Sequence, residues 1–435
     1  MKILILYHKK PRAQRKAISG HLEAFRYTKS HHVEYWNIAY GAPNILSECD
    51  FDVVIFHFTF FLPNINKKFD DEFIQWSVLK NMDAYKVALV QDEYIHTISL
   101  CNFFKEFGVK EIFSCLPETL FQTVYPKEKT GLEYYHTVLT GYIDDQMIKD
   151  YGQHAIPHDK RRYDIAYRAR KMPYNLGLFG TYKWRLTETF HKYCEGTNFR
   201  TNLSNDPQDF LFGEAWYAFV ADTRTMLGCE GGASLHDPDG SIRSCCEKIM
   251  IEKSNLSFEY VEELCFKNLD GKFPYFAISP RHFEAAVSKT CQVLIEGHYN
   301  GILQPWVHYI PIRKDWSNMT QVLEKIADVE YCEKLAENAY IDLVQSGKFT
   351  YSKFIDFVFG NIEKHAALKD STQTNRNALS KLRFFQKYPF LISPKPYVKA
   401  HLTEWVKQIV WTMGWDKKQW FKKIELKIFG HNSVR

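Results

Sequence analysis

The sequence predicts an α/β protein with two Rossmann-like lobes that face a cleft, followed by a helical C-terminal extension. Three observations lead to this prediction. The length of 435 residues exceeds what one ordinary core accommodates. Apolar, β-branched runs of strand length alternate with helical patterns, which is typical of parallel sheets covered on both faces. The alternation then restarts after a polar stretch at residues 152–162.

The first lobe is assigned to residues 1–150. It opens with an apolar run at 2–8, a polar loop and a helical stretch at 18–27, which together form a βα unit. Further buried strands are expected at residues 33–36, 52–58, 86–91, 111–115 and 135–139. Helical patterns at 72–80 and 97–107 lie between several of them.

The second lobe is assigned to residues 155–340. Strands are expected at 163–167, 225–227, 274–278, 291–295 and 307–312, with helices at 184–193 and 281–289. The carboxyl ends of the two sheets then face each other across a cleft, and in open α/β sheets that edge is where ligands bind.

The remainder of the chain is predicted to be largely helical. Residues 341–370 are expected to pack back on the lobes. Residues 371–435 form a basic tail rich in tryptophan and phenylalanine. Such a tail can lie in a membrane interface or pack on the protein as a helical cap, and both alternatives stay open.

Composition favours a cytoplasmic protein. The apolar run at the N-terminus is too short for a signal peptide, and no stretch of about 18 apolar residues could span a membrane. Ten cysteines follow no regular framework, and the vicinal pair Cys245 and Cys246 is poorly suited to a disulfide, which indicates a reducing compartment. The net charge of +5 does not specify nucleic acid as a partner.

The most informative segment spans residues 279–318. A strand ends at Ser279, Pro280 opens a helix, and Arg281 and Glu284 lie in its first turns. The N–H groups of such a helix can bind phosphate, and an acidic residue there can accept both hydroxyls of a ribose. As a bare pattern, a glutamate at this position is usually solvated or caps the helix.

A second segment, residues 164–186, brings arginines to the edge of the second lobe. A strand delivers Arg168 and Arg170, and Gly177 and Gly180 allow a tight turn before Lys183 and a helix. Guanidinium groups suit phosphate or carboxylate oxygens, and glycine lets the backbone approach a ligand. The alternative is surface charge beside an ordinary turn.

Three carboxylates are candidates for catalysis. Glu230 and Asp237 lie in a glycine-containing loop, where a carboxylate can stabilise an oxocarbenium-like centre or attack it. Asp237 also belongs to Asp-Pro-Asp-Gly, an ordinary turn sequence, so Glu230 is preferred. Asp92 ends an apolar strand of the first lobe and is either a general base for the acceptor or a helix cap.

These segments together resemble the GT-B glycosyltransferases that build bacterial cell-surface polysaccharides. Arg281 and Glu284 match an R-x-F-E element, and His308 opens an H-Y-I-P-x-x-x-D segment. One departure is that Phe276 stands where many retaining members carry a first glutamate. Loosely, the chain is also similar to retaining Kdo transferases, which use a CMP-activated donor and a carboxylate nucleophile.

The resemblance implies donor contacts from Arg281, Glu284 and His308, and places Arg168, Arg170 or Lys183 near phosphate or an acidic sugar. It implies transfer from a nucleotide sugar, such as CMP-Kdo, to a growing surface glycan such as lipopolysaccharide O-antigen or capsule. A lipid-linked acceptor would be met at the inner membrane face by a peripheral enzyme. We expect no cofactor, and no metal because a DxD element is missing. The alternatives are a nucleotide-sugar epimerase or hydrolase, or a glycan-binding module.

Overall fold

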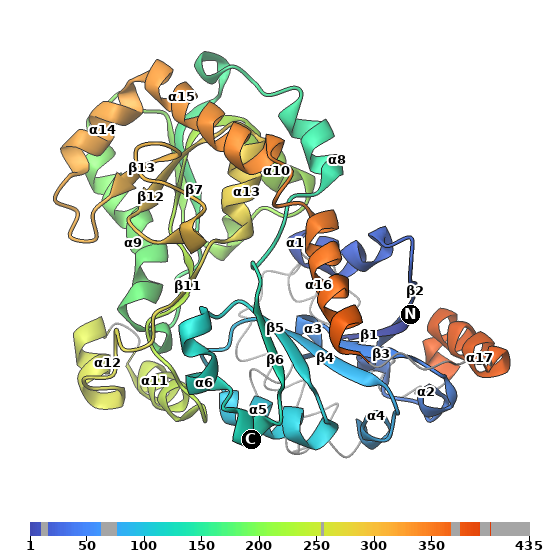
Figure 1. The fold of residues 1–435 in the computed structure, drawn as a ribbon. Coiled ribbons are helices and arrows are strands. Elements are labelled where there is room, and N and C mark those ends of the chain that lie inside the picture. Colours follow the sequence, from blue (N-terminus) through green and yellow to red (C-terminus); the bar gives the residue numbers. More distant parts are fainter. Residues whose placement is uncertain (10–15, 62–75, 254–255, 367–374, 392–400, 402–435) are drawn as a thin grey trace.

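The computed structural model describes residues 1–9, 16–61, 76–253, 256–366, 375–391 and 401. Two parallel sheets, each flanked by helices, form two lobes (Figure 1). The predicted α/β fold of two Rossmann-like lobes with a helical C-terminal segment is therefore confirmed. Over the described ranges, none of the helices combines the length and apolar character that crossing a bilayer requires.

The first sheet has the strand order β2-β1-β3-β4-β5-β6, and every neighbouring pair is parallel. Its strands are β1 (Lys2–Tyr7), β2 (His32–Asn37), β3 (Val53–Phe56), β4 (Tyr85–Val90), β5 (Glu111–Ser114) and β6 (Tyr134–Thr137). Strand β3, with the sequence VVIF, is buried throughout. Such continuous apolar runs are possible because helices cover both faces of a parallel sheet.

The second sheet has the order β13-β12-β9-β7-β8, again all parallel. Its strands are β7 (Tyr163–Arg168), β8 (Thr201–Ser204), β9 (Thr223–Gly228), β12 (Cys291–Ile295) and β13 (Tyr309–Ile312). The predicted strand at 274–278 exists as β11 (Tyr275–Ala277). It pairs antiparallel with β10 (Gly231–Ala233), outside the main sheet.

The helices of the first lobe are α1 (Lys16–Glu23), α2 (Ile45–Glu48), α3 (Phe58–Phe61), α4 (Ser77–Lys80), α5 (Thr97–Phe107), α6 (Phe121–Val124) and α7 (Lys127–Thr130). Helix α8 (Asp145–Met147) lies against the second lobe, where Met147 packs on that lobe's core (Figure 1). The other helices of the second lobe are α9 (Gly177–Cys194), α10 (Glu214–Ala221), α11 (Ser241–Glu252), α12 (Phe258–Cys265), α13 (Pro280–Val287), α14 (Met319–Ala327) and α15 (Val329–Ala339). The predicted helix at 72–80 lies partly outside the described residues.

Two C-terminal helices return to the first lobe. Helix α16 (Tyr351–His365) buries Phe354, Val358 and Ile362 in the first lobe's core, and Figure 1 shows it descending from the second lobe along the first. Helix α17 (Arg376–Lys387) packs on α2, and Arg383 pairs with Glu34. This part of the basic tail thus caps the protein, while 392–400 and 402–435 lie outside the described residues.

Direct hydrogen bonds join the lobes. The Tyr275 hydroxyl donates to Glu93 Oε2 at 3.2 Å, and Thr140 Oγ1 donates to the carbonyl of Ile278 at 2.6 Å. The backbone N–H of Asp237 donates to the carbonyl of Tyr94 at 2.7 Å. The loop after β10 is therefore part of the lobe interface.

The structure contains one disulfide, which the irregular cysteine spacing did not predict. Cys245 of α11 and Cys265 of α12 are bonded, with their Cα atoms 5.7 Å apart, and the other eight cysteines are free. The two residues are 20 positions apart in sequence and meet because α11 and α12 pack on one small core. The spacing of cysteines along the chain does not reveal this contact.

The N-terminus of α9 is already occupied by the protein's own polar groups. Leu178 N–H donates to Asp270 Oδ2 and Phe179 N–H donates to Ser234 Oγ, both at 3.2 Å. Gly177 has a φ of 76°, and a Cβ there would collide with Asp270 and Ser234. The helix begins at Gly177, so Gly180 lies inside it and the expected turn before Lys183 is absent.

We predict that Gly177→Ala destabilises the protein by clearly more than Gly196→Ala. Gly196 has a similar φ of 74°, but a methyl group added there would have no heavy atom within 4 Å, so this variant isolates backbone strain of about 1 kcal/mol. Gly177→Ala adds the displacement of the helix cap. Urea denaturation of both variants measures the difference, and equal losses would contradict the capping role.

Candidate active site

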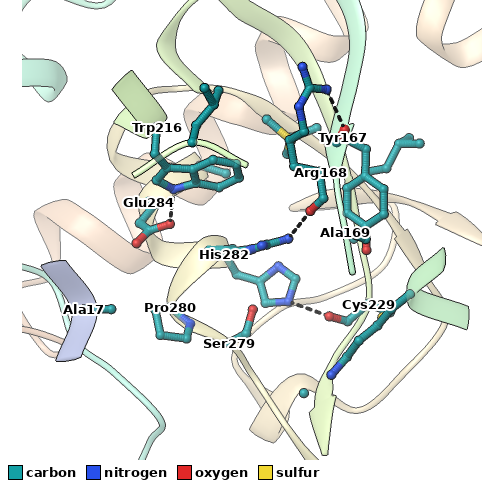
Figure 2. A pocket seen from close by; sticks show the side chains of 18 of the residues that line it. Ala17, Tyr167, Arg168, Ala169, Trp216, Cys229, Ser279, Pro280, His282 and Glu284 are labelled. Atoms are coloured by element: carbon teal, nitrogen blue, oxygen red, sulfur yellow. Dashed lines mark hydrogen bonds between the residues drawn. The ribbon is translucent and has the colours of Figure 1, made fainter. Parts of the chain in front are cut away.

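A pocket of about 440 Å³ lies at the carboxyl ends of β7 and β9. The strand order reverses here, because β8 lies on one side of β7 and β9 on the other. Ligands of open α/β sheets bind at such switch points. The lining includes Arg168, Gly228, Lys183, Trp216, Arg281 and Glu284 from the second lobe, and Lys16 and Ala17 from α1 of the first. Figure 2 shows Ala17 facing α13 from the opposite wall.

Helix α13 forms one wall of this pocket. Pro280 occupies its first turn, where its missing N–H costs no helical hydrogen bond. The helix lies close to the end of β9, since a Cβ on Gly228 would be 2.8 Å from Leu294 Cδ2 and 3.3 Å from His282 Cε1. Gly228 therefore permits the close approach that brings the first turns of α13 to the pocket.

Arg281, Glu284 and Trp216 form one connected group. The Trp216 indole Nε1 donates to Glu284 Oε2 at 2.7 Å, as Figure 2 shows. Arg281 stacks on the same indole, with Cζ 4.9 Å from the ring centroid, and its Nη1 donates to the Arg168 carbonyl at 2.6 Å. Glu284 is buried, so the indole holds its carboxylate in a fixed orientation.

The three predicted basic residues of the second segment all line the pocket but differ in availability. The guanidinium of Arg168 donates to the carbonyls of Tyr167, Asn202 and Asp209 and to Asn202 Oδ1. Arg170 is exposed and lies over the ring of Phe210 at 5.4 Å. Within the described part of the chain, Lys183 makes no hydrogen bond or ion pair, which leaves its ammonium group available to an anion.

Glu230 follows β9 and lines the pocket, but it also supports a neighbouring loop. Its Oε1 accepts the backbone N–H of Tyr299 at 2.7 Å. Burial raises the pKa of its carboxyl, and hydrogen bonds from the backbone of Tyr299 and His298 oppose that rise. Glu230 is thus held in a fixed position at the carboxyl end of the sheet.

Asp92 lies after β4 in the first lobe. Its backbone N–H donates to the Tyr275 hydroxyl at 3.3 Å. The side chain keeps solvent contact, yet desolvation by the surrounding protein raises the pKa of its carboxyl, and the positive charge of Lys183 partly offsets this rise. Asp92 therefore faces the second lobe near the pocket without lining it.

The structure places Asp237 and His308 outside the pocket lining. The Asp237 carboxylate accepts N–H groups of Ile242 and Arg243 and caps α11. His308 accepts the Gln304 N–H at Nδ1, and its Nε2 lies 2.9 Å from Asp342 Oδ2. The bond to Nδ1 fixes Nε2 as the protonated nitrogen. Both side chains hold loops in place. Neither contacts the pocket, so the catalytic role predicted for Asp237 and the donor-binding role predicted for His308 stay predictions.

Sequence reasoning did not identify Trp216, His282 and the α1 residues Lys16 and Ala17 as part of the site. Trp216 lies in an apolar helical segment, where a tryptophan is most simply explained as core. Lys16 pairs with Glu214 of α10 across the lobes, a contact that only the relative placement of the lobes creates. His282 is the variable residue x of the R-x-F-E element, so that element could have indicated that His282 lies at the pocket.

The chain matches no protein-family model and no curated protein sequence. Solved structures of similar fold include Alr3699/HepE of Anabaena in complex with UDP and glucose. The identity is 10% and the TM-score 0.46, over 84% of this chain and all of that one. An alpha-glucosyltransferase (AGT) in complex with UDP is 12% identical with a TM-score of 0.48, over 84% of this chain and 100% of the other. TarM is 9% identical with a TM-score of 0.38, over 71% of this chain and 54% of its own.

We predict that His282 makes stability depend on pH. Burial lowers the pKa of its imidazole from 6.5 to about 4. In the unfolded chain this imidazole becomes protonated below about pH 6.5, whereas in the folded protein it becomes protonated only near pH 4. The free energy of unfolding therefore decreases as the pH falls from about 6.5 to about 4. The contribution is at most about 3 kcal/mol.

His282→Gln removes this group, so the stability difference between wild type and variant should shrink as the pH falls from about 6.5 to about 4. Urea denaturation at several pH values measures it. His191→Gln, at an exposed position on α9, is the control. A difference that stays constant with pH would show that His282 does not reject the proton.

Proposed function

We propose that this protein is a GT-B glycosyltransferase that binds a nucleotide-sugar donor in the pocket between β7, β9 and α13. The observation that carries the proposal is that Lys183, predicted from one segment, and Arg281 and Glu284, predicted from another, line one pocket at the switch point of the second sheet. A nucleotide sugar needs cations for its phosphate and a carboxylate for its ribose, and this set supplies both.

The phosphate end of the donor is assigned to the cationic wall of the pocket. The ammonium group of Lys183 and the guanidinium of Arg281 approach from α9 and α13. The first turn of α13 adds backbone N–H groups, whose partial positive charge favours an anion. Arg168 supports this wall through its carbonyl oxygen, which accepts from Arg281, rather than through its own guanidinium.

The ribose end of the donor is assigned to Glu284. A carboxylate can accept several hydrogen bonds at once, the one from the Trp216 indole among them, and an acidic residue at this place in an α/β sheet is suited to accept neighbouring ribose hydroxyls. The orientation fixed by the indole lowers the entropy lost on binding. Glu284 therefore acts as a recognition residue and need not change its protonation state during the reaction.

The acceptor is assigned to the side of the first lobe, from which Lys16 and Ala17 reach the pocket. Asp92 is the candidate general base there, since desolvation raises the pKa of its carboxyl toward neutral pH. The sequence resemblance supports transfer from a CMP-linked acidic sugar such as Kdo to a bacterial surface glycan. The missing DxD element supports transfer without a metal. Attachment to the inner membrane face rests on the tail beyond residue 391.

We predict that Glu284→Gln weakens nucleotide-sugar binding about tenfold or more, because hydrogen bonds to a charged acceptor contribute about 1.5–3 kcal/mol. Glutamine keeps an acceptor for the Trp216 indole, so the unliganded protein should stay folded. Thermal shift and calorimetry against CMP-, UDP-, GDP- and dTDP-linked sugars measure the affinity and identify the nucleobase of the donor. Glu324→Gln on the exposed face of α14 is the matched control.

Unchanged affinity in Glu284→Gln would remove the ribose assignment. If donors bind and are hydrolysed but no glycan acceptor is glycosylated, the protein is a hydrolase on the same fold. If glycans bind while nucleotide sugars leave the melting temperature unchanged, it is a glycan-binding module.

For the stereochemical course, we predict that Glu230 is the nucleophile of a retaining double displacement, because of the predicted catalytic carboxylates it is the one lining the pocket. Incubation with donor alone should then add the mass of one glycosyl unit, mapped to Glu230 by peptide mass spectrometry. Glu230→Gln should abolish the adduct, whereas Asp237→Asn should retain it. An inverted anomeric product, seen by NMR, would contradict the double displacement.

A further inference from the structure

A second cluster of ionisable side chains lies in the first lobe, away from the pocket. Glu111 is the first residue of β5, His136 lies on the neighbouring β6, and His365 is the last residue of α16. Their ligand atoms all lie within 4.8 Å of one another. Because Glu111 stands at the amino end of its strand, the cluster is at the sheet edge opposite to the one that faces the pocket.

Both histidines converge on the same carboxylate oxygen. His136 Nε2 lies 2.7 Å and His365 Nδ1 lies 3.2 Å from Glu111 Oε1. Ligand atoms held about 2.0–2.1 Å from a tetrahedral Zn²⁺ are about 3.3 Å apart, so small side-chain shifts would place one ion among the three atoms. Imidazole and carboxylate are also ligands that zinc prefers.

The charge of Glu111 needs a partner. Its side chain is fully buried, and an isolated buried carboxylate is costly. Its hydrogen-bond partners within the described ranges are the two imidazoles and the Tyr85 hydroxyl, which donates to Oε2 at 3.0 Å. No Lys or Arg in that part of the chain pairs with it. A divalent cation held by all three side chains would place a positive charge directly beside this carboxylate.

The ligands are held in position before any ion binds. The His365 ring stacks on Tyr134 with centroids 3.5 Å apart and planes 4° from parallel. The His136 ring stacks on Phe113 at 4.7 Å and 21°. Tyr85 orients the carboxylate, as outer partners of metal ligands commonly do. The two histidine side chains remain 16% and 18% exposed, so the cluster is in contact with solvent.

We propose that Glu111, His136 and His365 bind a divalent transition-metal ion of the zinc type, with water as a fourth ligand. The ion joins the C-terminal end of α16 to β5 and β6. The ion would fix this return segment, and it would take no part in sugar transfer because none of its three ligands lines the pocket. The site is independent of the proposed donor pocket.

The test uses the full-length protein, stripped with a chelator and titrated with Zn²⁺ or Co²⁺. We expect one metal per chain by elemental analysis, a Co²⁺ absorption spectrum typical of four-coordination that Zn²⁺ abolishes, and a rise in melting temperature on adding Zn²⁺. Glu111→Gln and His365→Gln should each bind at least tenfold more weakly. Glu133→Gln, which removes a nearby surface ion pair with Lys110, and His191→Gln should bind like wild type.

Circular dichroism of each variant shows whether it is folded. If Glu111→Gln does not fold, the wild-type Co²⁺ spectrum and the effect of the chelator still decide the question. A wild-type protein that binds no Zn²⁺ and melts unchanged after chelation would overturn the proposal, and the cluster would then be a hydrogen-bonded pair of imidazoles on a carboxylate. Metal that Glu111→Gln and His365→Gln retain at wild-type affinity would overturn it as well.

Discussion

The reversal of strand order between β7 and β9 is the constraint on which the candidate active site depends. From β7 the chain crosses to β8 on one side, and from β9 it crosses to β12 on the other. Because such crossovers are right-handed, α9 and α13 must cover opposite faces of the sheet. The crevice between them receives Lys183 from one helix and Arg281 and Glu284 from the other.

Polar groups in this crevice divide into those that hold the structure and those that remain for a ligand. Arg168 uses its guanidinium on backbone carbonyls, and Asp270 with Ser234 occupies the N-terminus of α9. The glycine turn that would suit a phosphate is therefore filled by the protein itself. The positive charge available to an anion therefore lies on Lys183 of α9 and at the beginning of α13, both of which line the pocket.

The sequence predicted buried elements well and tertiary contacts poorly, for a physical reason. Strand β3 is a continuous apolar run and β12 is apolar except for Gln292, whereas β8, with the sequence TNLS at the sheet edge, buries little and gave no signal. Glu284 and Arg281 could be predicted because they lie in the first turns of a helix that follows a strand and because they match the R-x-F-E element. Asp237 and the Cys245–Cys265 bond could not, because loop and helix packing decide them. Residues 111, 136 and 365 are too far apart in sequence to suggest a cluster.

The two lobes must keep a definite relation for the pocket to be complete, since one wall comes from α1. The pair between Lys16 and Glu214 spans the pocket rim, and Glu214 also accepts from the Tyr151 hydroxyl at 2.6 Å. These contacts are exposed and individually weak. The buried hydrogen bond from Tyr275 to Glu93 and the apolar face of α16 are stronger constraints, because breaking them exposes a carboxylate or core side chains. These buried contacts fix the position of the first lobe relative to α13 before a donor binds. The weak contacts at the pocket rim permit small changes in that position.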